Sequence, residues 1–360
     1  MSDIKITECV EDKSSQFNLK KFKIGNKVFE FPEKTVDVRY ISQKFTDIIK
    51  TKNPILEKSK TIKNFDQIKK IVESNDEKQI NDFFDSKKWT NYYFKTINLT
   101  FEFNPFKDTN DKLKELEPFL EYYYTHSKNI LTIPNISIKF IDVDDYIKFV
   151  DFCYDFLNSM NSKPIFVPIS TRFGMTGIKK LLAHYLKKER YYIWFDFEGM
   201  SLNENASARI RHIRRTLNEK GIFDKCVVYF TNIKREISSN IKADNSAASD
   251  ILSSIGGANI VGINRDPQKF NPNAPIKKVD QKELWKHKAR YFDNETYYYS
   301  KFKDGTLELK NLNILKNTSR LQGELDNQTK VFLETYKIKD YITKKPIVKD
   351  YPVVFKNILY

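Results

Sequence analysis

Two carboxylates stand inside an apolar segment of the chain. The segment YYIWFDFEGM, residues 191–200, has the composition of a buried strand but carries Asp196 and Glu198. Because the two acids are two residues apart, they lie on the same face of a strand. Two carboxylates in one site can divide the roles of acid, base and nucleophile when their pKa values are pushed apart. This segment is the strongest candidate for a catalytic site.

The alternation of residues along the segment predicts where the acids point. One face is wholly apolar and is expected to pack under helices. The other face places Trp194 deep in the fold, with Asp196 and Glu198 at the carboxyl end of the strand. In parallel α/β folds that end of the strands carries the active site. We therefore expect Asp196 and Glu198 to act as nucleophile or general acid/base, with Trp194 lining the substrate site.

Polar side chains also follow three neighbouring predicted strands. They are the candidates for substrate binding: Ser170, Arg172, Asn232, Asn264 and Arg265. Arginine grips phosphate or carboxylate through two N–H groups, so the two arginines favour an anionic substrate. The competing interpretation is structural, because strand ends are polar where the chain leaves the core and acids often cap the next helix.

An alternation of strand-like and helix-like segments positions these residues. About six such units follow one another between residues 95 and 264. Strands separated by amphipathic helices need crossover connections, so they lie parallel in one sheet. The pattern predicts a β/α barrel of the TIM type, either regular or incomplete and irregular, with an open doubly wound sheet as the alternative.

The chain divides into three parts by composition. Residues 1–90 alternate Lys-rich pieces with short apolar patches and are predicted to form an N-terminal α+β appendage. Residues 91–266 carry the repeated units of the barrel-like core. Residues 267–360 are predicted to be an extension that packs on the core, with a hairpin turning at Asp304 and Gly305 followed by a helix.

The charge balance favours an anionic partner. The formal net charge is +15, which attracts polyanions such as DNA or RNA. An alternative is that AT-rich codons account for much of the lysine. Arg211 and Arg215 lie on the outer side of a predicted basic helix, which is either a nucleic-acid surface or a solvated face. The run TYYYSKFK, residues 296–303, is a candidate for stacking on single-stranded bases.

Other classes of site have little support. The three cysteines and four histidines lack metal-ligand spacing, so neither a zinc site nor a disulfide framework is predicted. The acid cluster DVDD at 142–145 is explained more simply as a helix N-cap than as a metal site. No particular cofactor is indicated. No apolar run reaches about eighteen residues, and no secretion signal is evident, so a cytoplasmic protein without membrane contact is expected.

Together these features predict a barrel-type enzyme that acts on an anionic substrate, with nucleic acid as one candidate. Two carboxylates without a metal fit glycosyl-bond chemistry, including base removal or exchange by a hydrolase or transferase, better than hydride or acyl transfer. The alternative is a non-catalytic nucleic-acid-binding or structural protein on a barrel-like scaffold. No motif of a particular family emerges.

Overall fold

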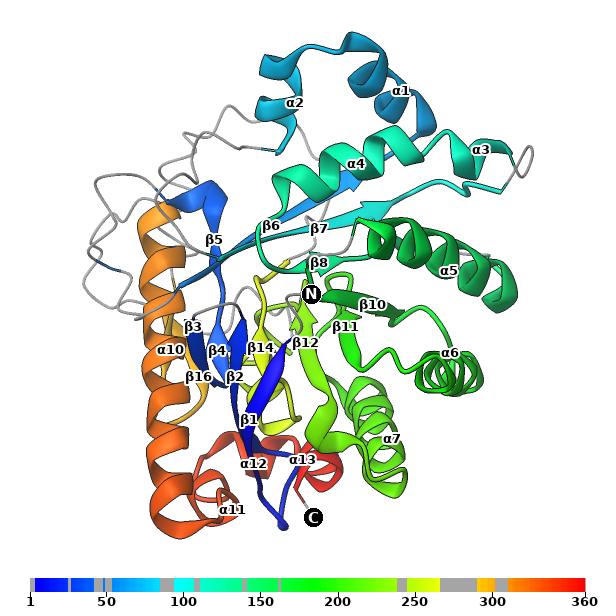
Figure 1. The fold of residues 1–360 in the computed structure, drawn as a ribbon. Helices are drawn as coiled ribbons and strands as arrows, with labels where there is room; N and C mark the ends of the chain where they lie inside the picture. Colours follow the sequence, from blue (N-terminus) through cyan, green and yellow to red (C-terminus); the bar gives the residue numbers. More distant parts are fainter. Residues whose placement is uncertain are drawn as a thin grey trace, which may run out of the picture.

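The computed structural model has a mixed α/β fold in which helices surround a curled parallel sheet (Figure 1). It describes the chain apart from residues 1–3, 25–26, 42–47, 49–53, 85–93, 107–110, 138–140, 161–162, 238–244, 266–289, 302–309 and 360. The first part of the predicted C-terminal extension, residues 267–289, lies outside the described residues.

Ten parallel strands form two sheets. The first has the order β4 (Glu33–Lys34), β14 (Ile260–Val261), β12 (Val227–Thr231), β11 (Tyr192–Asp196), β10 (Ile165–Ser170), β8 (Leu131–Thr132). The second has the order β5 (Val36–Asp37), β6 (Ile55–Ile62), β7 (Phe94–Phe101), β9 (Asn135–Ile136). The predicted parallel arrangement of the strands is confirmed.

Two short segments belong to both sheets. Residues 33–37 pair with β14 through β4 and with β6 through β5. Residues 131–136 pair with β10 through β8 and with β7 through β9. The sheets therefore continue into one another, and the parallel sheet curls into a half-barrel (Figure 1).

The N-terminal ninety residues contribute strands to the parallel sheets in addition to an antiparallel hairpin. β2 (Asn18–Ile24) and β3 (Lys27–Phe31) form an antiparallel hairpin, and β1 (Lys5–Glu11) pairs with the other side of β2. Strands β4, β5 and β6, however, lie within the parallel sheets. Their Lys-rich composition is misleading, because Lys58 and Lys60 lie on the outer face of β6 and donate to the Phe83 carbonyl at 2.9 and 3.0 Å.

An apolar cluster fills the amino-terminal half of the sheet's inner face. Rings from the N-terminal hairpin contact rings at the strand starts; Phe29, for example, packs edge-on against Phe94 with centroids 4.1 Å apart. Trp194 and Tyr229 lie in the same cluster, both wholly buried. Polar side chains of the inner face therefore gather toward the carboxyl ends of the strands.

The helices cover the outer face, and a larger apolar cluster lies between them and the sheet (Figure 1). The longer ones are α1 (Phe65–Ser74), α2 (Glu77–Phe84), α4 (Glu117–His126), α5 (Val143–Ser159), α6 (Met175–Lys187), α7 (Glu204–Glu219) and α10 (Lys310–Thr335). The short ones are α3 (Asp111–Lys114), α8 (Leu252–Ile255), α11 (Lys339–Ile342), α12 (Ile347–Asp350), α13 (Pro352–Ile358) and the 3-10 turns η1 (Val38–Tyr40) and η4 (Phe223–Lys225). No helix among the described residues combines the length and apolarity needed to cross a membrane.

The C-terminal hairpin differs from its prediction. Strands β15 (Arg290–Asp293) and β16 (Tyr298–Lys301) turn within residues 294–297, whereas the predicted turn at 304–305 lies outside the described residues. In the predicted alternation, residues 246–257 have the pattern of a helix, but the structure forms β13 (Asn245–Ala247), which pairs with β16, and then the single turn of α8.

The aromatic run of this hairpin is part of the core. Tyr297 and Tyr299 are wholly buried, and their hydroxyls donate to Glu324 at 2.6 Å and to Asp250 at 2.8 Å. The prediction that these rings offer a stacking surface for nucleic acid is therefore wrong. Burying the rings while pairing each hydroxyl is the ordinary way in which tyrosine is accommodated in a core.

Gly262, which follows β14, lies tightly against the end of β12. A Cβ at this position would lie 2.6 Å from the Thr231 hydroxyl oxygen and 2.7 Å from the Phe230 carbonyl oxygen. We expect Gly262→Ala to lower the free energy of unfolding by about 1–3 kcal/mol, as overpacking does. Gly323→Ala is the control, because a Cβ at Gly323 of α10 meets nothing within 4 Å. Equal urea midpoints for the two variants would contradict this expectation.

Candidate functional site

The two predicted acids lie at the carboxyl end of the sheet's inner face. Asp196 is the last residue of β11, and Glu198 follows it in the next turn. Asp196 is wholly buried, and the Glu198 side chain is only 4% exposed. Both carboxylates must therefore be satisfied by groups of the protein or by a ligand.

Asp196 accepts hydrogen bonds from residues at the ends of β9 and β12. The side-chain amides of Asn135 and Asn232 each donate to it at 2.9 Å, and so does the backbone N–H of Glu198. Burial raises the pKa of the Asp196 carboxyl from 3.8 to about 6, and the nearby charge of Glu198 acts in the same direction. This carboxyl therefore changes between its protonated and its ionised form at a pH close to neutral.

Glu198 collects donors from the ends of β9 and β10. The hydroxyl of Ser137 donates to it at 2.7 Å, and Ser170 and the Arg172 Nε also donate. Asn135 completes the set at 3.3 Å. In the described part of the chain Arg172 is hydrogen-bonded through its side chain to Glu198 alone, and that side chain is 41% exposed. The arginine thus connects the buried acids with the surface.

The backbone at this site adopts an unusual conformation twice. Glu198 has φ 50° and Asn232 has φ 53°, both in the left-handed region. For a residue other than glycine this costs on the order of 1–3 kcal/mol, and such residues cluster at functional sites. The Asn232 Oδ1 is also buried without a hydrogen-bond partner among the described residues. An acceptor of this kind beside Asp196 suits a donor group on a ligand.

Three predicted substrate-binding residues lie apart from this network. Trp194 belongs to the apolar cluster beneath it. Asn264 instead donates to Asp250 at 2.8 Å. Arg265 is partly exposed, and its backbone N–H bonds to the Ile233 carbonyl. The structure thus brings Ser170, Arg172 and Asn232 to the acids but not the other three candidates.

The arginines of α7 do not form one basic surface. Arg211 and Arg215 are exposed as predicted, and Arg215 pairs with Glu219 at 2.6 Å. Arg209 instead donates to the Thr171 carbonyl. Arg214 is buried and pairs with Glu11 at 2.9 Å. Only part of this helix is therefore available to an anionic partner.

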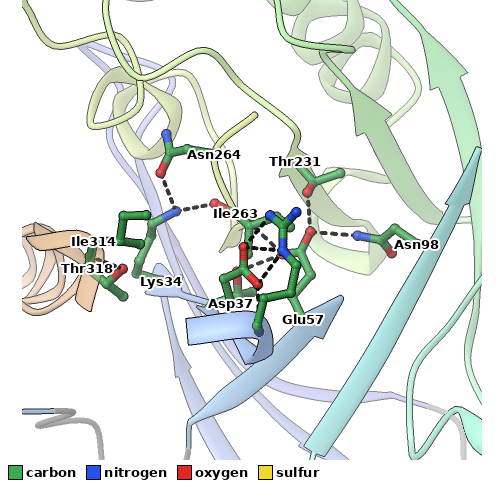
Figure 2. Close-up of polar contacts among 12 residues, drawn as sticks. Lys34, Asp37, Glu57, Asn98, Thr231, Ile263, Asn264, Ile314 and Thr318 are labelled. Atoms are coloured by element: carbon green, nitrogen blue, oxygen red, sulfur yellow. Dashed lines mark hydrogen bonds and ion pairs between the residues drawn. The ribbon is translucent and has the colours of Figure 1, made fainter. Parts of the chain in front are cut away.

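Sequence reasoning missed another buried carboxylate on the inner face, Glu57 of β6 (Figure 2). One oxygen accepts from Asn98 at 2.7 Å and from the Thr231 hydroxyl. The other accepts from the Thr35 hydroxyl at 2.7 Å and from the Ile263 N–H at 2.8 Å. Glu57 therefore joins the segments of β4, β7, β12 and β14. The signal was the inward alternation Ile-x-Glu-x-Ser-x-Thr of residues 55–61, which the intervening lysines obscure.

A buried lysine lies beside this carboxylate (Figure 2). Lys34 is wholly buried and donates to the Gly262 carbonyl and, at 3.3 Å, to Asn264. Burial lowers the pKa of its ammonium group, while the charges of Asp250, Glu57 and Asp37 oppose that shift. Asn264 bridges Lys34 to Asp250. This predicted substrate-binding residue is therefore part of a buried network of charged groups on the outer side of the sheet.

The fold and the site together define an α/β protein with a buried carboxylate pair at the ends of its parallel strands. In the described ranges, no three side chains of His, Cys, Asp or Glu come together as a metal site. No protein-family model and no curated protein sequence matches the chain.

Two solved structures illustrate the weak similarity of this chain to known folds. One is the carboxyl transferase domain of Rhizobium etli pyruvate carboxylase with pyruvate: identity is 11%, the TM-score is 0.32, and 64% of this chain and 36% of that chain are covered. The other is a spore coat polysaccharide biosynthesis protein E from Chromobacterium violaceum: identity is 11%, the TM-score is 0.29, and 61% and 68% are covered. The chain thus spans about a third of the length of the first.

Proposed function

We propose that the protein is a β/α-barrel enzyme that uses Asp196 as general acid/base and Glu198 as nucleophile or stabilising carboxylate in glycosyl-bond cleavage or exchange on an anionic substrate. The observation that carries the proposal is the buried pair itself, held at the strand ends by donors from four segments with an unoccupied acceptor beside it. Parallel α/β folds carry their active sites at this end of the strands.

The strand pairings support a complete barrel. Starting from the segment 33–37, neighbours follow in the order β6, β7, the segment 131–136, β10, β11, β12 and β14, which pairs with 33–37 again. This ring has eight positions, the number of strands in a TIM-type barrel. The antiparallel hairpin then closes the amino-terminal end.

The environments of the two acids suit different roles. Asp196, whose pKa is raised to about 6 by burial, can protonate a leaving group and later accept a proton from water. Glu198 is oriented by Ser137, Ser170 and Arg172, as a carboxylate that attacks or stabilises an anomeric carbon would be. One acid that donates a proton and one oriented carboxylate are the minimal equipment for this reaction.

The anionic substrate is supported by Arg172 and by the net charge of +15. Nucleic acid and nucleotides are the substrates to test first, because they combine a glycosyl bond with phosphate. We expect the wild-type protein to release free base or sugar from one of them and to bind it less tightly as salt increases.

A charge substitution sharpens this test. Arg172→Gln should weaken binding about tenfold, the effect of losing one charge-assisted contact, and should lessen the salt dependence. Arg320→Gln is the matched control, since Arg320 is exposed, lies on helix α10 and donates to the Phe292 carbonyl at 2.9 Å. Binding is measured across a salt series, and release is measured by chromatography. A protein that releases nothing from DNA, RNA, nucleotides or sugar phosphates would contradict the proposed reaction.

The alternative is a binding or structural protein, and one observation favours it. Every carboxylate oxygen of Asp196 and Glu198 already accepts a hydrogen bond within the chain. A closed network of this kind also ties strand ends together without chemistry. Salt-dependent binding without turnover would support this alternative.

A further inference from the structure

Asn135 contacts both acids at once. It lies on β9, wholly buried, and its amide nitrogen donates to Asp196 at 2.9 Å and to Glu198 at 3.3 Å. An amide nitrogen carries two hydrogens, so it can serve both carboxylates together. Turned the other way, the amide would place its oxygen against two carboxylates, and one of them would have to hold a proton.

A tyrosine from the helix layer holds the other end of this amide. The hydroxyl of Tyr146 donates to the Asn135 Oδ1 at 2.7 Å. Burial raises the pKa of this phenol well above its usual value, so it stays a neutral donor. No other donor to that oxygen occurs among the described residues. The hydrogen-bonding pattern therefore assigns the oxygen end to Tyr146 and the nitrogen end to the acids.

The position of Tyr146 follows from its helix. Asp142 caps α5, accepting from the Asp144 N–H at 2.7 Å, as the sequence predicts for DVDD. Tyr146 lies in the first turn, with its own N–H on the Asp142 carbonyl at 3.0 Å and its ring edge-on to Phe173 at 4.9 Å. The hydroxyl thus reaches the strand ends from a helix that is held independently of the acids.

We propose that Tyr146 is a positioning residue: by holding the oxygen of Asn135 it keeps the amide nitrogen on both carboxylates and so determines how readily Asp196 takes up a proton. Among the described residues, the charged and titratable groups around the pair are Glu198 itself, Arg172 after β10, and Tyr146 from α5. The catalytic meaning of this arrangement rests on the proposed function, but its test does not.

The test is a pH titration of the full-length protein labelled with [γ-13C]aspartate and followed by NMR, with the Asp196 signal assigned from Asp196→Asn. Tyr146→Phe keeps the ring and removes the hydroxyl. We expect the Asp196 midpoint to rise by about one pH unit, the scale of one altered hydrogen bond. Asn135→Asp should raise it further, because it removes the donor and adds a third carboxylate.

Tyr185→Phe is the matched control. Tyr185 is equally buried, but its hydroxyl donates to the Pro168 carbonyl at 2.8 Å, away from the acids. We expect no change of midpoint in this variant. An unchanged midpoint in Tyr146→Phe would overturn the proposal. If Tyr146→Phe does not fold, Asn135→Asp decides: a midpoint that fails to rise there would overturn it equally. A shifted midpoint without any turnover would retain the positioning role and reject the enzyme.

Discussion

Asp196→Asn is expected to lower kcat of the proposed reaction by a factor of about 10²–10⁴, with little change in substrate affinity. Asparagine has the shape of aspartate but cannot take up or release the proton. Steady-state kinetics on the substrate that the wild type cleaves measure the effect. Asp155→Asn is the control, because that side chain on α5 is 71% exposed. A variant with wild-type kcat would remove Asp196 from the mechanism.

The same variant has a second readout that needs no substrate. The folded-state pKa of Asp196, about 6, lies above its ordinary value of 3.8, so the folded protein binds the proton more tightly than the unfolded chain. The resulting stabilisation is complete below pH 3.8 and is lost as pH rises through 6. Between pH 4 and pH 7 the wild type should lose up to about 3 kcal/mol of unfolding free energy relative to Asp196→Asn. Urea unfolding at several pH values measures this difference, and parallel pH profiles would contradict it.

Glu57→Ala is expected to lower the free energy of unfolding by about 3–5 kcal/mol. The substitution leaves a cavity and removes the acceptor from Asn98, Thr231, Thr35 and the Ile263 N–H, all buried. Unpaired buried donors cost about 1–3 kcal/mol each before relaxation. Because these donors come from both sheets, the loss should appear as one cooperative transition at lower urea, followed by circular dichroism.

Glu57→Gln tests whether both side-chain oxygens of Glu57 must accept hydrogen bonds. Each oxygen of Glu57 receives one hydroxyl, which can rotate, and one fixed donor: Asn98 on one side and the Ile263 N–H on the other. Whichever way the glutamine lies, its NH2 meets a fixed donor, so a loss of about 1–3 kcal/mol is expected. Glu102→Ala, at an exposed position beyond β7, should stay within about 0.5 kcal/mol of wild type. A Glu57→Ala loss no larger than that of Glu102→Ala would show that Glu57 does not hold the sheets together.

Part of the site was predictable because strand alternation is a local property. The period of two in residues 191–198 put Asp196 and Glu198 on one face, and the parallel pairing of β10, β11 and β12 brought Ser170, Arg172 and Asn232 beside them. Similarly, the inner face of α7 depends on residues three or four apart in the chain, and the cap of α5 depends on residues two apart.

Local patterns in the sequence therefore predict most of the strands and helices between residues 95 and 264 and the burial of the acids at a strand end. They do not predict that Asn135 and Tyr146 hold those acids, that Glu57 joins the two sheets, or that Asn264 binds Lys34, because these contacts depend on the tertiary structure. These contacts link residues from 11 to 230 positions apart. Their partners are chosen by the register and curvature of the sheet, which no local pattern of polar and apolar residues encodes.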